Sequence, residues 1–323
     1  MHADWSVTPA KRWIARATLG ADGRYHAEQS QRVEHATSLL STLGEQVGQA
    51  GAALVGFDFP IGLPLAYARR AGIKEFITIL PELGKDRWSK FYEPAHTPEE
   101  ISIRRPFYPG RAGNTRQQHL LKQLGFETIN DIRRRCELSH PVRRAACPLF
   151  WTLGAQQVGK AAISGWRQVL VGENGILPNV SLWPFSGSLT ELIQPGQVIV
   201  AETYPAEFYT HLGVRFSKRK RGEKTGKRSQ ADRAANSSCL LEFAKQAGIT
   251  LTPSLEIEIL DGFGPAPDAE DRFDAIVGLF GMLNVVFGGR SPGEPENEDV
   301  QKIEGWILGQ EWTDSNSYRN KEE

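Results

Sequence analysis

An acidic residue, Asp58, stands where this sequence predicts the end of a buried strand. Residues 54–57 are a short apolar run, and Pro60 and Gly62 must end the strand shortly after Asp58. Ligands of open α/β sheets gather outside the carboxyl ends of the strands, so a carboxylate there can meet a metal, a substrate or a partner charge. The alternative is that Asp58 caps the turn that follows, by accepting backbone N–H bonds.

Glu202 repeats this pattern later in the chain. Residues 197–201 form a second apolar run that predicts a buried strand, and Glu202 follows it directly. Pro205 then suits the first turn of a helix expected over residues 206–212. Each of these two strands would therefore end in a carboxylate, at the same end of a sheet.

Asp4 lies in the first expected strand, next to Trp5. Strand interiors are poor places for aspartate, because its short polar side chain does not suit a pleated, half-buried surface. Asp4 is therefore either a residue of an edge strand that faces water, or a charged residue whose side chain points into the protein.

Asp271 and Asp274 lie where a late helix begins. Residues 275–287 are apolar nearly all round, which predicts a buried helix and places Asp274 close to the core. Asp268 and Glu270 are explained by the helix dipole. Asp271 shares a face with Asp274, where like charges repel unless a cation or a buried partner offsets them, so we expect a functional pair.

A strongly basic segment spans residues 215–228. Its cations are Arg215, Lys218, Arg219, Lys220, Arg221, Lys224, Lys227 and Arg228, with Glu223 as the acid among them. Glycines and the lack of apolar periodicity predict a surface loop at about residues 215–230. This loop is either a solvated charge run or a segment that tracks phosphates.

The elements around these residues predict an α/β fold. Residues 2–27 read as three antiparallel strands with short turns, followed by a helix between Val33 and Val47 that stops near Gly51. The strand before Asp58 would lie beside the first strand. We expect a mixed sheet with helices on both faces.

A large, mostly helical insertion is predicted between about residues 65 and 180. We expect helices near residues 65–71, 115–124, 129–137 and 156–171. Its aromatic and basic residues either form one wall of a substrate cleft or pack a small core: Arg104, Arg105, Phe107, Tyr108, Arg111, Trp151 and Trp166. After the basic loop, a helix at 230–247 and a short strand near 256–260 belong to a single predicted domain over residues 1–310, and a polar tail follows at 311–323.

Composition narrows the classes of function. Of the 323 residues, 38 are Lys or Arg and 38 are Asp or Glu, so no overall charge attracts nucleic acid or membrane. The first residues do not resemble a secretory signal, and the longest apolar stretch is too short to cross a bilayer; we expect a cytoplasmic protein without membrane contact.

Three cysteines fit a reducing compartment, and Cys136, His140 and Cys147 lack a fourth ligand at zinc spacing. Gly159-Lys160 lacks the glycine spacing of a P-loop.

Taken together, the acidic positions resemble those of the ribonuclease H-like fold. More closely, four short sequence motifs resemble those of a family of unknown function that is described as predicted ribonuclease H-like nucleases. The motifs are Phe57-Asp-Phe-Pro-Ile-Gly-Leu-Pro64, Glu202-Thr-Tyr-Pro205, Asp271-Arg-Phe-Asp274-Ala275 and Glu304-Gly-Trp-Ile307. Asp271 and Asp274 also resemble the late acidic pair of RuvC-type resolvases. The resemblance covers most of the core, from Asp4 to Ile307, but not the insertion.

The resemblance implies that the acids meet at one end of the sheet and bind divalent metal. Clustered carboxylates suit Mg²⁺ or Mn²⁺, and two such ions would support hydrolysis of phosphodiester bonds in DNA or RNA. Asp4, Asp58, Glu202 and Asp274 are the expected metal ligands, with Asp271 also expected at the catalytic site. Lys218, Arg219, Lys220, Arg221, Lys224, Lys227 and Arg228 are the expected contacts to nucleic acid.

Two alternatives remain open from the sequence. One is an actin-like or sugar-kinase-like ATPase on the same fold, although residues 6–10 stand where a glycine-rich phosphate hairpin is expected. The other is a non-enzymatic module that binds nucleic acid and in which the acids are structural. Metal-independent binding without cleavage would favour the second alternative.

Overall fold

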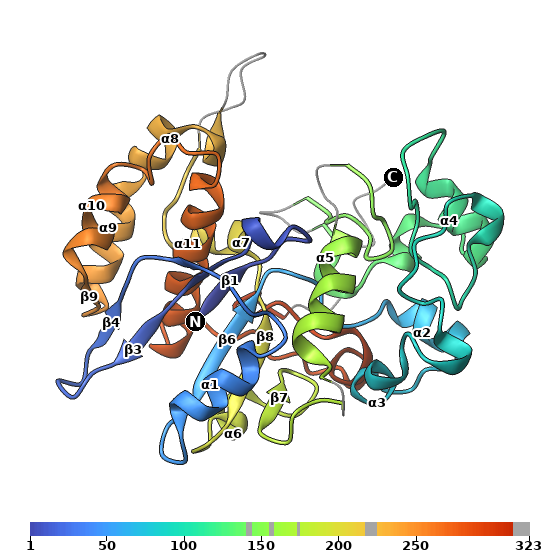
Figure 1. Ribbon diagram of the computed structural model, residues 1–323, viewed down its shortest axis with the longest axis horizontal. Helices are drawn as coiled ribbons and strands as arrows, with labels where there is room; N and C mark the ends of the chain where they lie inside the picture. The colour runs from blue at the N-terminus through green and yellow to red at the C-terminus, as the bar shows by residue number, and fades with distance from the viewer. Residues whose placement is uncertain (140–143, 155–157, 173–174, 217–224, 313–323) are drawn as a thin grey trace.

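A computed structural model describes residues 1–139, 144–154, 158–172, 175–216 and 225–312 (Figure 1). The fold is α/β. A six-stranded mixed sheet carries helices on both faces, as the sequence predicted, and a small three-stranded sheet lies beside it.

The main sheet has the strand order β5-β2-β1-β6-β8-β7, and the second sheet has the order β3-β4-β9. The strands are β1 (His2–Asp4), β2 (Trp13–Ala15), β3 (Ala17–Leu19), β4 (Tyr25–Ala27), β5 (Gln31–Arg32), β6 (Ala53–Phe57), β7 (Val180–Leu182), β8 (Val198–Glu202) and β9 (Thr250–Leu251). In the main sheet, β2 pairs antiparallel with β1 and β5, whereas β1, β6, β8 and β7 run parallel.

The α-helices divide into those of the sheet core, those of the insertion and those after the basic segment. They are α1 (Leu39–Val47), α2 (Leu65–Ala71), α3 (Phe76–Ile79), α4 (Gln117–Leu124), α5 (Val158–Gly165), α6 (Leu189–Leu192), α7 (Pro205–His211), α8 (Gln230–Ala234), α9 (Ser237–Gln246), α10 (Pro253–Leu260) and α11 (Ala269–Val286).

The two faces of the main sheet can be told apart along β8. Val198 and Val200 join the apolar core that contains α1, α5 and the insertion, whereas Ile199 and Ala201 join the core that contains α7 and α11. This alternation follows from the two-residue period of a strand. Side chains on successive residues of β1, β6 and β8 therefore face opposite layers.

The first part of the chain departs from the expected three-stranded meander. The stretch 12–19 breaks into β2 and β3 instead of forming one strand. β1 and β2 pair as predicted, but β3 and β4 form a hairpin in the second sheet. The helix after them begins at Leu39 and ends at Val47, where Gly48 has a φ of 58°.

The strand predicted near residues 256–260 is wrong, because this stretch lies in α10. Thr252 caps the helix by accepting from the Leu255 N–H, and Pro253 occupies its first turn. The helix predicted over 230–247 is divided into α8 and α9. Asn236, between them, donates its side-chain N–H groups to the carbonyls of Arg215 and Asp232.

The insertion, predicted to be mostly helical, contains α2, α3, α4 and α5, but most of its described residues lie in turns and loops, and residues 129–137 form two 3-10 turns instead of an α-helix. Its large aromatic residues pack its core: Phe107, Tyr108 and Trp166 are buried. Trp166 also donates its indole N–H to the Pro60 carbonyl at 2.6 Å, which ties the insertion to the end of β6. These three aromatic residues therefore pack a core, whereas Trp151 is half-buried and Arg104 and Arg105 line a pocket.

The described helices include none whose length and apolar character would allow it to cross a membrane. The longest, α11, is buried against β1, β2 and α7 instead.

Candidate functional site

Asp4 and Asp58 lie side by side at the carboxyl ends of β1 and β6. Ala3 is in register with Phe57, so the two aspartates are the next pair along these parallel strands. The two carboxyl groups are joined by a hydrogen bond. The backbone N–H of Trp5 also donates to Asp58 Oδ1 at 2.5 Å, which fixes the orientation of this carboxyl.

The helix α11 supplies the third carboxylate, Asp274, which is 2% exposed. The helix lies close to β1 because Gly278 has no side chain: a Cβ there would be 2.2 Å from the ring of His2. His2 and Asp4 point to the same side of the sheet, since they are two residues apart. Asp274, one turn before Gly278, therefore faces the aspartates of the strands.

Both carboxylate oxygens of Asp274 have protein partners. The Tyr209 hydroxyl, from α7, donates to Oδ1, and the Lys227 ammonium forms an ion pair with Oδ2. Lys227 belongs to a 3-10 turn at Gly226–Arg228 that packs against α8 and α11. The ion pair thus brings the end of the basic segment to the acidic residues.

The electrostatics of this site are dominated by burial and by repulsion between acids. Burial, with the charges of Asp58 and Asp274, raises the pKa of Asp4 well above its usual range. Burial, together with the charge of Asp274, raises the pKa of Asp58 to about 7, against the opposing effect of the Trp5 N–H. Lys227 lowers both pKa values.

Asp271 lies near the rim of the same cluster. Burial and the neighbouring Glu270 raise the pKa of Asp271 to about 6, and Asp274 adds to this effect. Its partial exposure and its position on the first turn of α11 suit a group that titrates near neutral pH. The structure therefore brings together Asp4, Asp58, Asp271 and Asp274, which we call the acid cluster.

Glu202 is not part of the acid cluster. It is in register with Phe57 in β6, so Asp58 is level with Thr203 instead. Because side chains alternate along a strand, Glu202 points to the face opposite to Asp58. The expectation that Glu202 joins Asp4, Asp58 and Asp274 as a metal ligand is therefore wrong.

A buried arginine from the insertion binds Glu202. Arg134 donates to Glu202 Oε1 at 2.7 Å and to Oε2 at 2.6 Å, and Ile61 N–H also donates to Oε2 at 2.6 Å. Arg134 Nε donates to Glu137 at 2.9 Å. Every side chain in this group is buried, so we call Arg134, Glu137 and Glu202 the arginine cluster.

Most of the basic residues predicted to bind nucleic acid lie outside the described residues: Lys218, Arg219, Lys220, Arg221 and Lys224. Lys227 is described, and it contacts Asp274. Arg228 Nε lies 3.7 Å from Glu270 at the start of α11. His140 also lies outside the described residues, while Cys136 is buried beside the arginine cluster.

The sequence pattern did not identify Tyr209 or Arg134. Tyr209 lies on the predicted helix after Pro205, but nothing in its neighbours indicates a contact with Asp274. Comparisons of this chain with protein-family models, with curated proteins and with solved structures found no match.

Proposed function

We propose that the acid cluster binds Mg²⁺ or Mn²⁺ and that the protein hydrolyses phosphodiester bonds in nucleic acid. The observation that carries this proposal is the meeting of Asp4, Asp58 and Asp274, which come from two strand ends and a buried helix. Perturbed carboxyl groups gathered in this way are typical of functional sites.

The donor set fits a hard divalent cation, because every expected ligand atom is a carboxylate oxygen. Among the described residues, no group of three or more His, Cys, Asp or Glu side chains is already arranged to hold a metal. The pKa values of Asp4 and Asp58 are nevertheless raised, so these groups retain protons at a pH where carboxyls usually ionise. A cation supplies the positive charge that those protons now provide.

Asp4, Asp58 and Asp274 would hold the metal. A bound divalent ion supplies activation of water and stabilisation of the leaving oxygen of a phosphodiester. The chain contributes orientation: Trp5 fixes Asp58, and Tyr209 fixes one oxygen of Asp274. Lys227, which is paired with Asp274, offsets part of the negative charge of the acid cluster.

The sheet gives a second support for this proposal. An antiparallel partner follows β1, and β6 then joins β1 in parallel, so the strand ends that carry Asp4 and Asp58 lie together. This is the placement that the resemblance to the ribonuclease H-like fold implies. We therefore include that fold in the proposal, with Glu202 in a structural role.

The experiment is a digestion panel of single- and double-stranded DNA and RNA, with Mg²⁺, Mn²⁺ or EDTA. We expect cleavage by the natural protein that EDTA abolishes. Asp58→Asn keeps the side-chain volume and the acceptor for Trp5, and it should lower the rate by at least roughly 100-fold, since loss of groups that merely orient ligands costs 10- to 100-fold.

Glu45→Gln is the matched control, because it also removes one carboxylate charge. Glu45 is exposed on α1 and lies outside the acid cluster. This variant should retain full activity. No metal-dependent cleavage of any substrate by the natural protein, or full activity of Asp58→Asn, would contradict the proposal.

A further inference from the structure

Three neighbouring pockets lie along the insertion and share lining residues. The first is lined by Val7, Lys160 and Arg167, among others, and it shares Tyr92 and Arg167 with the second. The second, of about 340 Å³, shares Ser89 with the third. We call this line of hollows the insertion pockets.

Cations dominate the lining of the insertion pockets, although the chain as a whole is neutral. The basic residues are Lys160, Arg167, Lys85, Arg87, Lys90, Arg104 and Arg105, and the acidic ones are Glu93 and Glu100. Arg105 is already bound by Glu100 and by backbone carbonyls. In the part of the chain that the structure describes, the side chains of Lys85, Lys90, Arg104 and Lys160 have no hydrogen bond or ion pair.

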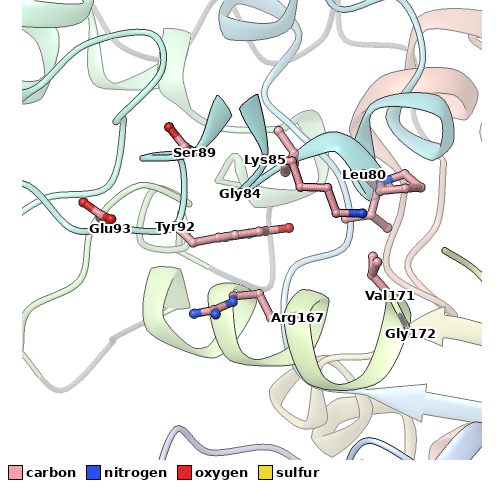
Figure 2. Close-up of a pocket in the computed structure, with 11 residues that line it drawn as sticks. Leu80, Gly84, Lys85, Ser89, Tyr92, Glu93, Arg167, Val171 and Gly172 are labelled. Atoms are coloured by element: carbon pink, nitrogen blue, oxygen red, sulfur yellow. The ribbon is translucent and has the colours of Figure 1, made fainter. Parts of the chain in front are cut away.

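The second pocket lies between the other two, and the residues that line it pack closely. Figure 2 shows the Tyr92 ring between Arg167 and the segment that carries Gly84, with the Tyr92 hydroxyl directed toward the side where Lys85 lies. The Arg167 guanidinium is 5.7 Å from the centre of the Tyr92 ring. Gly84 has a φ of 86°, and a Cβ there would lie 2.9 Å from Tyr92, so the backbone approaches the ring closely. Arg167 and Lys85 are thereby presented to one hollow.

One end of the insertion pockets adjoins the strand that carries Asp4. The first pocket is lined by Val7 and Ser164, and Ser164 accepts a hydrogen bond from the Trp5 indole at 3.0 Å. The backbone N–H of Trp5 in turn binds Asp58. The Trp5 side chain lies on the sheet face opposite to Asp4, so a polymer that reaches both the acid cluster and the insertion pockets would pass the carboxyl ends of β1 and β6.

We propose that the insertion pockets bind the phosphate backbone of a nucleic-acid strand. The proposal rests on the proposed function, because it assigns a path to the same substrate. Lys and Arg side chains without protein partners neutralise phosphates, and guanidinium groups match phosphate oxygens with paired N–H donors. Contacts of this kind position a strand without reading its sequence.

The test is binding of a fluorescein-labelled 20-nucleotide oligothymidine, measured by fluorescence anisotropy in EDTA across a salt series. Triple substitution of Lys85, Lys160 and Arg167 with Ala should weaken binding. The log-log salt slope should fall by roughly 2, because each lost phosphate contact on a single strand contributes about 0.7. Arg167→Gln alone should lower the slope by about 0.7. This single variant tests the proposal even if the triple variant does not fold.

The matched control replaces Lys74, Lys122 and Lys245 with Ala. These exposed lysines do not line the insertion pockets, and their loss changes the net charge equally. The control should keep the natural slope. Equal slopes in both triple variants and in Arg167→Gln, no binding by the natural protein at low salt, or displacement by polyglutamate as efficiently as by unlabelled oligothymidine would overturn the proposal.

The two proposals fail separately. Metal-dependent cleavage together with an unchanged salt slope in the substituted variants would reject the insertion pockets and leave the proposed function intact. Binding with the predicted slope change, but without cleavage under any metal, would support the insertion pockets and reject the nuclease.

Discussion

The acid cluster and the arginine cluster are two groups of largely buried carboxylates that differ in how their negative charge is offset. In the arginine cluster, one fully buried guanidinium binds both Glu202 and Glu137. In the acid cluster, Asp4 and Asp58 bind each other, and Lys227 forms its ion pair with Asp274. Burial raises the pKa of Glu202, as it does in the acid cluster, but Arg134 opposes the rise.

This contrast separates a structural role from a functional one. A buried carboxylate with a matched cation has its charge satisfied within the fold, so it needs no ligand. A group of like charges without such a match is costly unless protons or metal ions bind there. The acid cluster is therefore where we expect chemistry, and the arginine cluster is where the insertion is fixed to the sheet.

The largest expected effect follows from removing the cation of the arginine cluster. Arg134→Met leaves Glu202 and Glu137 buried without their partner, so the free energy of unfolding should fall by about 3 to 5 kcal/mol. Chemical denaturation monitored by tryptophan fluorescence measures this change. Arg134→Lys, which keeps the charge but loses the paired donors, should cost less.

Arg24→Met is the matched control for this comparison, because Arg24 is exposed and outside both clusters. It should change the free energy of unfolding by less than about 0.5 kcal/mol. If Arg134→Met were as stable as Arg24→Met, the arginine cluster would not fix the insertion.

A smaller effect of opposite sign is expected in the acid cluster. The pKa of Asp58 is about 7 in the fold, above its usual value, so its protonated form stabilises the fold at low pH. This stability is present below about pH 4 and is lost as the pH rises toward 7. Asp58→Asn mimics the neutral carboxyl, so in EDTA it should be more stable than the natural protein at pH 8 by roughly 1 to 3 kcal/mol.

The same denaturation experiment at pH 4 and pH 8 checks this prediction. The difference between Asp58→Asn and the natural protein should nearly vanish at pH 4. A variant that is less stable than the natural protein at pH 8 would show that the charge of Asp58 is already satisfied within the fold.

The sequence predicted the strand ends that carry Asp58 and Glu202, because apolar runs followed by proline or glycine are local signals. It predicted that both carboxylates would meet Asp4, whereas Asp58 does so and Glu202 points to the other face. That outcome depends on the register between β6 and β8, where a shift of one residue turns a side chain to the other face. Arg134, which binds Glu202, is 68 residues away in the chain, so no local pattern connects them.

The same limit applies to the fold. The buried helix that carries Asp274 was predicted from its continuous apolar character, and α11 confirms it. The pairing of β4 with β9 joins residues that lie far apart in the chain, so turn signals within 2–27 predicted a local meander instead. α10 was missed because apolar residues at 255–260 suggested a strand, although Thr252 and Pro253 form a helix start.

The most direct test of the acid cluster is Mn²⁺ binding, measured by the loss of the free-ion electron paramagnetic resonance signal. The natural protein should bind Mn²⁺, and Asp58→Asn should weaken binding by at least 10-fold, the lower limit seen when groups that orient metal ligands are lost. Glu137→Gln, in the arginine cluster, should bind Mn²⁺ as the natural protein does. Equal affinity of Asp58→Asn and the natural protein would contradict the assignment of the metal to the acid cluster.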